Sequence, residues 1–344
     1  MEKLQLQTSN FDLCLFISTK SDEFGIFGMQ TDDTLTTYQK DPTTIQWWQT
    51  MNDKSLNFVQ KTQGQRLKEI EINSSTEVQE YIEQRARGAY IATICQPEAT
   101  YELSIAAQYQ NPTPENNKSL NKVIRWQMLN QQKGIKFILV DLWKAGLFIF
   151  VDASFANNKD LSSQIGFIIV LANEKPGDSK EEFLINGSLI HYSSVKSKRV
   201  TRSVLASELY AMVHGYDIDL SIETTLDLIA EQLMLKKIPI IMCTDSFSLY
   251  ECMLKLGTTS EKRLMIDITA LPQSYERREL AEIRWISRND NPADAMTKSM
   301  PTVALKNLIE RNGVRIRVEG WVERPKYHEA DWEAGIRCHS SEKQ

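Results

Sequence analysis

Apolar and polar positions divide the chain into two unlike parts, which meet near residue 147. In the first part, two extended runs at 13–18 and 24–30, joined by a short polar segment, predict a β-hairpin. The chain then becomes polar and less regular, with helical stretches at 75–92 and 118–130 on either side of a proline-containing loop. The first part therefore combines a small extended region with a largely helical one.

From residue 147 onward, the pattern predicts a mixed sheet with helices on its faces. The continuous apolar run 147–151 is expected of a central strand covered on both faces, and it stops at Asp152. Apolar residues at helical spacing predict an amphipathic helix over 204–218. The other expected elements are strands at 165–172, 183–193, 238–243 and 281–287, and helices from 246, at 261–279 and at 303–312. The order β-β-β-α-β-α-α-β-α describes an α/β domain.

Composition and charge narrow the class of protein. The chain has 344 residues, of which 42% are apolar and 25% charged, a globular composition with a length that suggests about two domains. Its five cysteines form no CxxC pair, so neither a disulfide framework nor a thiolate zinc site is indicated. No apolar run approaches the ~18 residues that span a bilayer, and the N-terminus is not signal-like. We therefore expect an intracellular protein, cytoplasmic or nuclear, without a signal peptide or membrane segment.

The net charge of -5 gives no overall field for binding nucleic acid, so any such contact must come from a local patch. The candidate patch is the basic run Lys196, Lys198, Arg199 and Arg202. Taken alone, this run is more typical of a solvated loop. Its position just before the helix at 204–218 gives it more weight once that helix carries part of a site.

Four acidic residues occupy positions where a structural role is hard to supply. Asp152 and Asp245 each follow an apolar strand, where uncompensated burial of a carboxylate is costly. Glu208 lies at the flank of the apolar stripe of its helix, and Asp294 follows the turn Asn291-Pro292-Ala293. Each acid taken singly fits a helix cap or a surface residue. Together the four indicate a metal site.

The chemistry of that site follows from its ligands. Two carboxylates ~4 Å apart repel by about 4 kcal/mol at an effective dielectric of 20, so four of them need cations. Hard oxygen ligands without nearby Cys or His select two Mg²⁺ ions, or Mn²⁺, over zinc. Two such ions suit phosphodiester hydrolysis, because they stabilise both the attacking and the leaving oxygen.

Four short motifs resemble the ribonuclease H domain of copia-type retrotransposons in order and context. They are Phe150-Val151-Asp152-Ala153-Ser154-Phe155, Ala206-Ser207-Glu208-Leu209, Thr244-Asp245-Ser246 and Asn291-Pro292-Ala293-Asp294. The resemblance covers about 147–312. It implies a ribonuclease H-like, five-stranded mixed sheet flanked by helices, and a hydrolase that cuts the RNA strand of an RNA–DNA hybrid with two Mg²⁺ ions.

The resemblance also implies roles for single residues. Asp152 would bridge both metals, Glu208 and Asp245 would complete one metal site, and Asp294 the other. The basic run, with Ser154 and Ser246 beside catalytic acids, would contact nucleic acid. The segments between the first three acids look long beside compact members of the superfamily, which predicts insertions at 173–182 and 219–237. Many ribonucleases H carry a histidine shortly before the last Asp, whereas this loop reads Ser287-Arg288-Asn289-Asp290-Asn291. Either turnover is reduced, or Arg288 partly substitutes for the histidine.

The N-terminal part resembles the end of a reverse transcriptase. Residues 28–35 resemble the palm hairpin that carries two adjacent aspartates, here Asp32 and Asp33, and 87–97 and 134–137 look like the connection to ribonuclease H. The family's first metal-binding Asp lies on a strand further upstream, and only 31 residues precede Asp32. We therefore expect the polymerase portion to be incomplete and inactive and the Asp32-Asp33 pair to be vestigial. The missing upstream polymerase portion of the element is a candidate partner.

These patterns predict four regions: a truncated palm remnant at 1–58, a thumb or connection-like region at 59–146, a ribonuclease H domain at 147–315 and a charged tail at 316–344. Two alternatives stay open beside the enzyme. The chain is an inactive retroelement relic that at most binds nucleic acid, or it is a transposase or integrase of the same superfamily, against which the Asn291-Pro292-Ala293-Asp294 ending argues. The sequence leaves the oligomeric state open.

Overall fold

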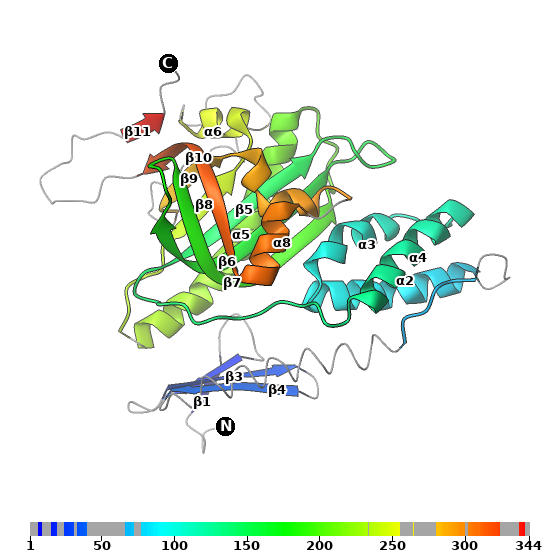
Figure 1. Ribbon diagram of the computed structural model, residues 1–344, viewed down its shortest axis with the longest axis horizontal. Coiled ribbons are helices and arrows are strands. Elements are labelled where there is room, and N and C mark those ends of the chain that lie inside the picture. The colour runs from blue at the N-terminus through cyan, green and yellow to red at the C-terminus, as the bar shows by residue number, and fades with distance from the viewer. Residues whose placement is uncertain are drawn as a thin grey trace, which may run out of the picture.

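The computed structural model describes residues 66–71, 77–232, 234–254, 264, 280–299 and 302–323, and the backbone alone of short strands outside these ranges. Within the described part, a mixed sheet lies beside a group of three helices (Figure 1).

Five strands form the centre of the sheet: β5 (Ala145–Ser154), β6 (Gln164–Pro176), β7 (Glu182–Lys196), β8 (Ile240–Thr244) and β9 (Glu282–Ile286). Their order is β7-β6-β5-β8-β9. The β5–β6 and β6–β7 pairs are antiparallel, whereas β5–β8 and β8–β9 are parallel. The prediction of a mixed sheet flanked by helices is thus confirmed.

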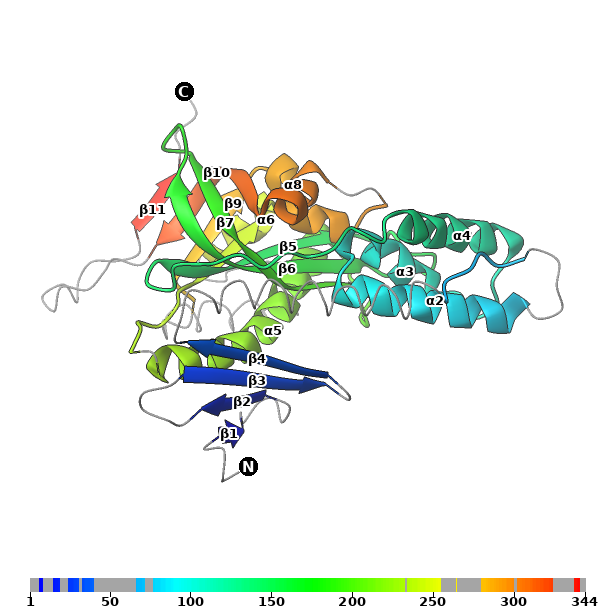
Figure 2. The same cartoon turned by 60° about the horizontal axis from the view of Figure 1, so that its bottom comes forward.

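Helices cover both faces of the sheet because its central strand is apolar on both sides. On one face, Leu147, Ile149 and Val151 of β5 pack in the core that includes α5 (Val204–Gln232) and α6 (Phe247–Leu254). On the other face, the alternate β5 residues Phe148 and Phe150 pack in the core that includes α8 (Val303–Arg311). Figure 2 shows α5 and α8 on opposite sides of β5 and β6. Helix α5 extends beyond the predicted end at residue 218, because Leu220, Ile222 and Leu226 continue its contact with the core.

Strand β10 (Gly313–Glu323) joins the two edges of the five-stranded centre. Its first half, 313–317, pairs with β7, and its second half, 318–323, pairs with β9. Strand β11 (Arg337–Ser340) then pairs with β10. Residues 316–323, which the sequence assigns to a charged tail, therefore belong to the sheet, and the expected five strands become seven.

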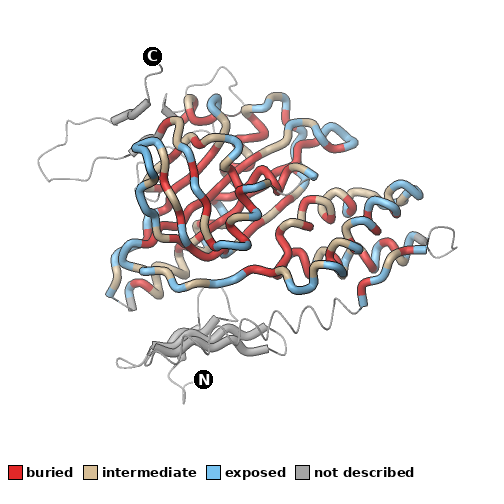
Figure 3. The backbone as a smooth tube through the Cα atoms, in the orientation of Figure 1, coloured by how far each residue is buried: buried red, intermediate tan, exposed pale blue. Residues whose placement is uncertain are grey.

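Three helices, α2 (Glu77–Ile94), α3 (Thr100–Ala106) and α4 (Pro114–Leu129), pack around a core of their own. Figure 3 shows buried positions lining the inside of this group, apart from those of the sheet. The predicted helices at 75–92 and 118–130 correspond to α2 and α4. No described helix combines the length and the apolar character that a membrane crossing needs.

Polar contacts fasten the helical group to the sheet. The Tyr192 hydroxyl of β7 donates to the backbone oxygen of Ala92 at 2.5 Å, and the Gln164 amide of β6 donates to the Ser104 hydroxyl at 2.9 Å. Both bonds involve residues that are buried or half-buried, where an unpaired polar group is costly. The helices are therefore held in a fixed position against the end of the sheet that carries Gln164.

Near the N-terminus, strands β1 (Leu6–Thr8), β2 (Leu15–Ser18), β3 (Phe24–Gln30) and β4 (Asp33–Gln39) form an antiparallel sheet in that order. The predicted hairpin between the first two extended runs is confirmed as β2–β3. In the β3–β4 hairpin, Gln30 pairs with Asp33, which is the first residue of β4. Asp32 and the helix predicted at 261–279 lie outside the described residues, apart from Leu264.

Candidate metal and nucleic-acid site

Two aspartates emerge side by side from the centre of the sheet. Strands β5 and β8 are parallel neighbours, and their register places Val151 opposite Thr244. The next residues, Asp152 within β5 and Asp245 just after β8, therefore lie side by side at the same edge of the sheet. In sheets of this kind, the carboxyl ends of parallel strands are where binding crevices form.

A short 3-10 helix, η6 (Pro292–Met296), brings a third aspartate to the same edge. The wholly buried side chain of Asn291 fixes the position of η6 through two hydrogen bonds. The Asn291 side-chain oxygen accepts from the Ala293 backbone amide at 3.1 Å, and the Asn291 side-chain amide donates to the Val151 backbone oxygen at 2.9 Å. The second bond ties η6 directly to the strand that bears Asp152. Asp294, which follows Ala293, is thereby turned toward Asp152.

The three aspartates are close enough to share one ion. One carboxylate oxygen each from Asp152, Asp245 and Asp294 lies within 4.8 Å of the others. Asp152 is 4% exposed and Asp294 8% exposed, so water screens their charges poorly. Burial, and then the charge of Asp152, raise the pKa of Asp245 above its usual range. The arrangement is costly without cations.

Glu208 stands next to this trio rather than inside it. It lies in the first turns of α5, is 6% exposed, and accepts a hydrogen bond from the Ala153 backbone amide. Burial, followed by the charges of Asp152 and Asp245, raises the pKa of Glu208 well above its usual range. Its second oxygen, Oε2, is buried and has no hydrogen-bond partner among the described residues. A carboxylate oxygen without a partner at this depth is suited to a cation.

The donor set therefore fits a hard divalent ion. The site offers carboxylate oxygens, and within the described chain no His or Cys joins the group that could hold a metal. This is the chemistry that Mg²⁺ and Mn²⁺ prefer. The buried, unpartnered oxygen of Glu208 is the observation that most directly favours an ion beside the trio.

Thr297 and Lys298, which follow Asp294 in the chain, also contact the acids. The Thr297 hydroxyl donates to Oδ2 of Asp152, and the Lys298 ammonium contacts Oδ1 of Asp294. Arg288 is more distant, with its Nε atom 3.9 Å from the same Asp294 oxygen and its side chain 71% exposed. Burial lowers the pKa of Lys298, and the charges of Asp152, Asp245 and Glu208 act in the opposite direction. The predicted replacement of the absent histidine, Arg288, thus lies beside the last acid.

A cleft of about 980 Å³ opens next to Asp294. One wall comes from the helical group through Tyr101 of α3, and Asn157 from the loop after β5 donates to the Tyr101 hydroxyl at 3.5 Å. The rest is lined by the segment that follows β9 and by the start of α8, including Arg288, Asn289, Lys298 and Val303. Asp294 is therefore the member of the trio that lies in the wall of this cleft.

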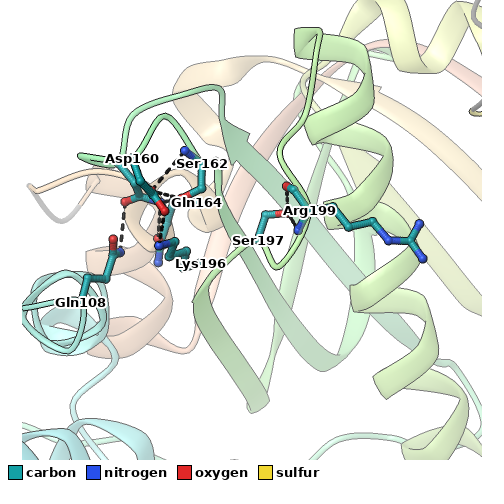
Figure 4. Close-up of polar contacts among 8 residues, drawn as sticks. Gln108, Asp160, Ser162, Gln164, Lys196, Ser197 and Arg199 are labelled. Atoms are coloured by element: carbon teal, nitrogen blue, oxygen red, sulfur yellow. Dashed lines mark hydrogen bonds and ion pairs between the residues drawn. The ribbon is translucent and has the colours of Figure 1, made fainter. Parts of the chain in front are cut away.

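The residues predicted to contact nucleic acid have diverse surroundings. Lys196 points at Asp160 and pairs with it at 2.5 Å, as Figure 4 shows, while Arg199 points away and lies over the Tyr210 ring at 5.6 Å. Lys198 and Arg202 are exposed. The Ser154 hydroxyl is buried without a hydrogen-bond partner among the described residues. Ser246 accepts from the Leu249 amide at 3.4 Å and so caps α6, the structural alternative to substrate contact.

Thr297, Lys298, Tyr101 and Asn157 were not anticipated from the sequence. Thr297 and Lys298 stand three and four residues after Asp294, and a short helical turn returns such residues to the same side of the backbone. That spacing was a usable signal. Tyr101 and Asn157 had no such signal, because only the packing of the helices against the sheet brings them together.

No protein-family model matches the chain, and no curated protein matches it. Among solved structures, LC11-RNase H1, isolated from compost, is 18% identical; the match covers 44% of this chain and 91% of that one, with a TM-score of 0.30. The Prototype Foamy Virus Protease-Reverse Transcriptase matches as a CSH mutant and in native form, at 12% and 11% identity and TM-scores of 0.28 and 0.25. These two matches cover 83% and 80% of this chain but 38% and 36% of the viral chains.

Proposed function

We propose that the chain is a metal-dependent ribonuclease H, of the kind found in copia-type retrotransposons, that hydrolyses the RNA strand of RNA–DNA hybrids. The observation that carries this proposal is the meeting of Asp152, Asp245 and Asp294 at one sheet edge, each with a carboxylate oxygen within 4.8 Å of the others. These residues belong to the motifs on which the family resemblance rests. Buried Glu208, from the remaining motif, adds its unpartnered oxygen.

The residues would divide the work as follows. Asp152, Glu208 and Asp245 would hold one Mg²⁺ or Mn²⁺ ion, and Asp152 with Asp294 the other. Two bound ions supply activation of the attacking water and stabilisation of the leaving oxygen. Asn291 would hold η6 in register with β5, so that Asp294 stays aligned with Asp152. The cleft beside Asp294 would receive the hybrid, with Lys198 and Arg202 as exposed cations available to phosphate.

The decisive experiment is cleavage of a labelled RNA–DNA hybrid in Mg²⁺, with duplex DNA as the negative substrate. We expect RNA cleavage alone, because hybrid recognition relies on the 2′-hydroxyl groups of one strand. Asp152→Asn should lower the rate roughly a hundredfold or more, equivalent to about 3 kcal/mol of lost transition-state stabilisation. Asp178→Asn is the matched control, since it makes the same change at an exposed residue between β6 and β7 that belongs neither to the trio nor to the basic run.

The alternative, an inactive relic, predicts a different result in the same assay. If the wild-type protein and Asp152→Asn fold equally well and both leave the hybrid intact, the relic is the correct interpretation. Cleavage that survives Asp152→Asn would instead point to a contaminating nuclease and would contradict the assignment of this residue.

We propose that these 344 residues have no polymerase activity on their own. Purified protein given a primed template, nucleotides and Mg²⁺ should not extend the primer, because the sequence contains no segment that resembles the strand with the family's first metal-binding Asp. Extension that is abolished by Asp32→Asn would overturn this part of the proposal.

A further inference from the structure

One cation of the protein already stands among the acids. The Lys298 ammonium contacts Oδ1 of Asp294, and its side chain is 36% exposed. The charges of Asp152, Asp245 and Glu208 also act on it, so all four acids lie within its electrostatic reach. Arg288, 3.9 Å from Asp294 and 71% exposed, is a looser neighbour.

This position is the one a divalent ion needs. Three carboxylates that share a region 4.8 Å across repel one another strongly in a poorly screened environment. An ammonium is a compact point charge on a flexible stem, so it relieves that repulsion while remaining free to leave. A divalent ion carries twice the charge and binds the same oxygens. Lys298 and the ion therefore compete for Asp294.

We propose that Lys298 is a tethered counter-ion, which holds the aspartates together in the metal-free protein, yields Asp294 to the incoming divalent ion, and moves into the adjoining cleft to bind a substrate phosphate. The inference rests on the proposed function, because it assumes that the acids bind divalent ions. It assigns to Lys298 a positioning role that couples metal binding to substrate binding.

The cleft is a suitable destination for the displaced side chain. Lys298 already lines it, together with Arg288, Asn157 and Asn289. The negative charge of Asp290 in the same wall is taken up by Arg317, whose guanidinium and backbone amide donate to it at 2.7 to 3.0 Å. Once the ion neutralises Asp294, Lys298 and Arg288 give the cleft an excess of positive charge. A phosphate of the nucleic-acid backbone is the ligand that such a groove favours.

The first measurement is Mn²⁺ binding to the whole chain, without nucleic acid, followed by electron paramagnetic resonance. Lys298→Gln should bind Mn²⁺ about fivefold more tightly or better, because the competing ammonium is gone. Lys298→Arg, which keeps the charge, should stay near wild type. Lys306→Gln on α8 is the control for the loss of one exposed positive charge. Thermal unfolding in EDTA should begin at a lower temperature for Lys298→Gln, and added Mg²⁺ should raise its Tm more than that of the wild type.

The second measurement is hybrid cleavage at saturating Mg²⁺. Lys298→Gln should raise KM severalfold, so one substitution tightens metal binding and weakens substrate binding, an opposition that loss of structure does not produce. An unchanged KM would overturn the movement into the cleft. Equal or weaker Mn²⁺ affinity in Lys298→Gln would overturn the counter-ion role while leaving the proposed function standing. A wild-type protein that binds no Mn²⁺ at all would overturn both.

Discussion

The orientation of Asp152 depends on a single hydroxyl. Thr297 donates to Oδ2 of Asp152, and both side chains are buried, so the bond restricts the orientation of the carboxylate. Such a bond to a charged group is worth about 1.5 to 3 kcal/mol. The side chain at position 297 therefore influences the orientation of the Asp152 carboxylate, although Thr297 is not itself one of the acids.

Replacing Thr297 by Val should disturb the orientation of the Asp152 carboxylate while leaving the charges of the four acids unchanged. The variant keeps the volume but removes the donor, so we expect hybrid cleavage to fall by about tenfold or more. Thr297→Ser, which keeps the hydroxyl, should retain most of the activity. Steady-state cleavage rates with a circular dichroism check of folding measure the difference. Equal activity of the Val and Ser variants would show that the hydroxyl has no such role.

Another buried acid, Asp219 of α5, lies outside the candidate site. It is wholly buried, and neither carboxylate oxygen has a hydrogen-bond partner among the described residues. Burial, and then the charge of Glu223 one turn away, raise the pKa of Asp219 to about 8. Lys237 does not relieve it, because its ammonium pairs with Glu223 at 2.6 Å. Asp219 is thus a cost to the fold whenever it is charged.

The sign of the resulting pH dependence follows from proton binding. Between the unfolded pKa near 4 and the folded pKa of about 8, the folded protein binds more protons at Asp219 than the unfolded chain does, so stability falls as pH rises. Asp219→Asn removes this loss and should stabilise the protein at pH 8 by an amount on the order of a few kcal/mol, with little effect near pH 4. Urea unfolding at several pH values tests this. A variant that is no more stable than the wild type at pH 8 contradicts the assignment.

Among the secondary-structure elements, the approach of η6 to the sheet decides whether the acids meet. Gly166 of β6 pairs with Asp152, and a Cβ at Gly166 would lie 2.5 Å from Met296 Cβ and 2.9 Å from Thr297 Cγ2. Those distances are too short for any side chain. Glycine at this position therefore lets η6, and with it Asp294 and Thr297, lie against the strand pair.

Gly166→Ala should displace η6 and weaken the site without destroying the sheet. Overpacking of this size costs about 1 to 3 kcal/mol, and the displacement should reduce Mn²⁺ affinity and hybrid cleavage by at least tenfold. Gly313→Ala is the matched control, because its new methyl group meets a milder contact, 3.2 Å from the Ile185 backbone oxygen, far along β7 from the acids. If Gly166→Ala binds Mn²⁺ as the wild type does, the close approach of η6 is not needed.

How far the sequence predicts these elements depends on the range of the interaction that forms them. Strands β5 and β8 follow from continuous apolar runs, and each run ends at the aspartate that the strand delivers. Helix α5 is longer than the sequence predicts, because its second half is only partly buried and therefore has a weaker apolar stripe than the first half. The bond from Asn291 to Val151 joins residues 140 positions apart, and no local pattern reports a contact of that kind.

At the scale of the molecule, β10 connects the two edge strands β7 and β9. Its charged residues make its strand pattern hard to recognise in the sequence. Val314, Ile316 and Val318 alternate with Arg315, Arg317 and Glu319, the period of two that a half-buried strand shows. The high charge of the residues from 316 onward favours a tail instead. β10 pairs with residues 182–186 of β7 and with β9, and on its outer face Arg315 forms ion pairs with Asp178 and Glu182.

The role of β10 in joining the edges can be tested through its inward and outward side chains. Ile316 is wholly buried, so Ile316→Ala should lower the free energy of unfolding by about 2 to 4 kcal/mol through lost burial and the cavity left behind. Arg315→Ala, on the exposed face of the same strand, should cost no more than about 1 kcal/mol, as expected of surface ion pairs. Urea denaturation of both variants gives the comparison.

Since β10 pairs with β9, which leads into η5 (Arg288–Asp290) and η6, the Ile316 variant should also lose Mn²⁺ affinity as the denaturant concentration rises, before the helical group α2–α4 unfolds. Equal and small losses for the two variants would mean that residues 313–323 behave as the charged tail that their composition suggests.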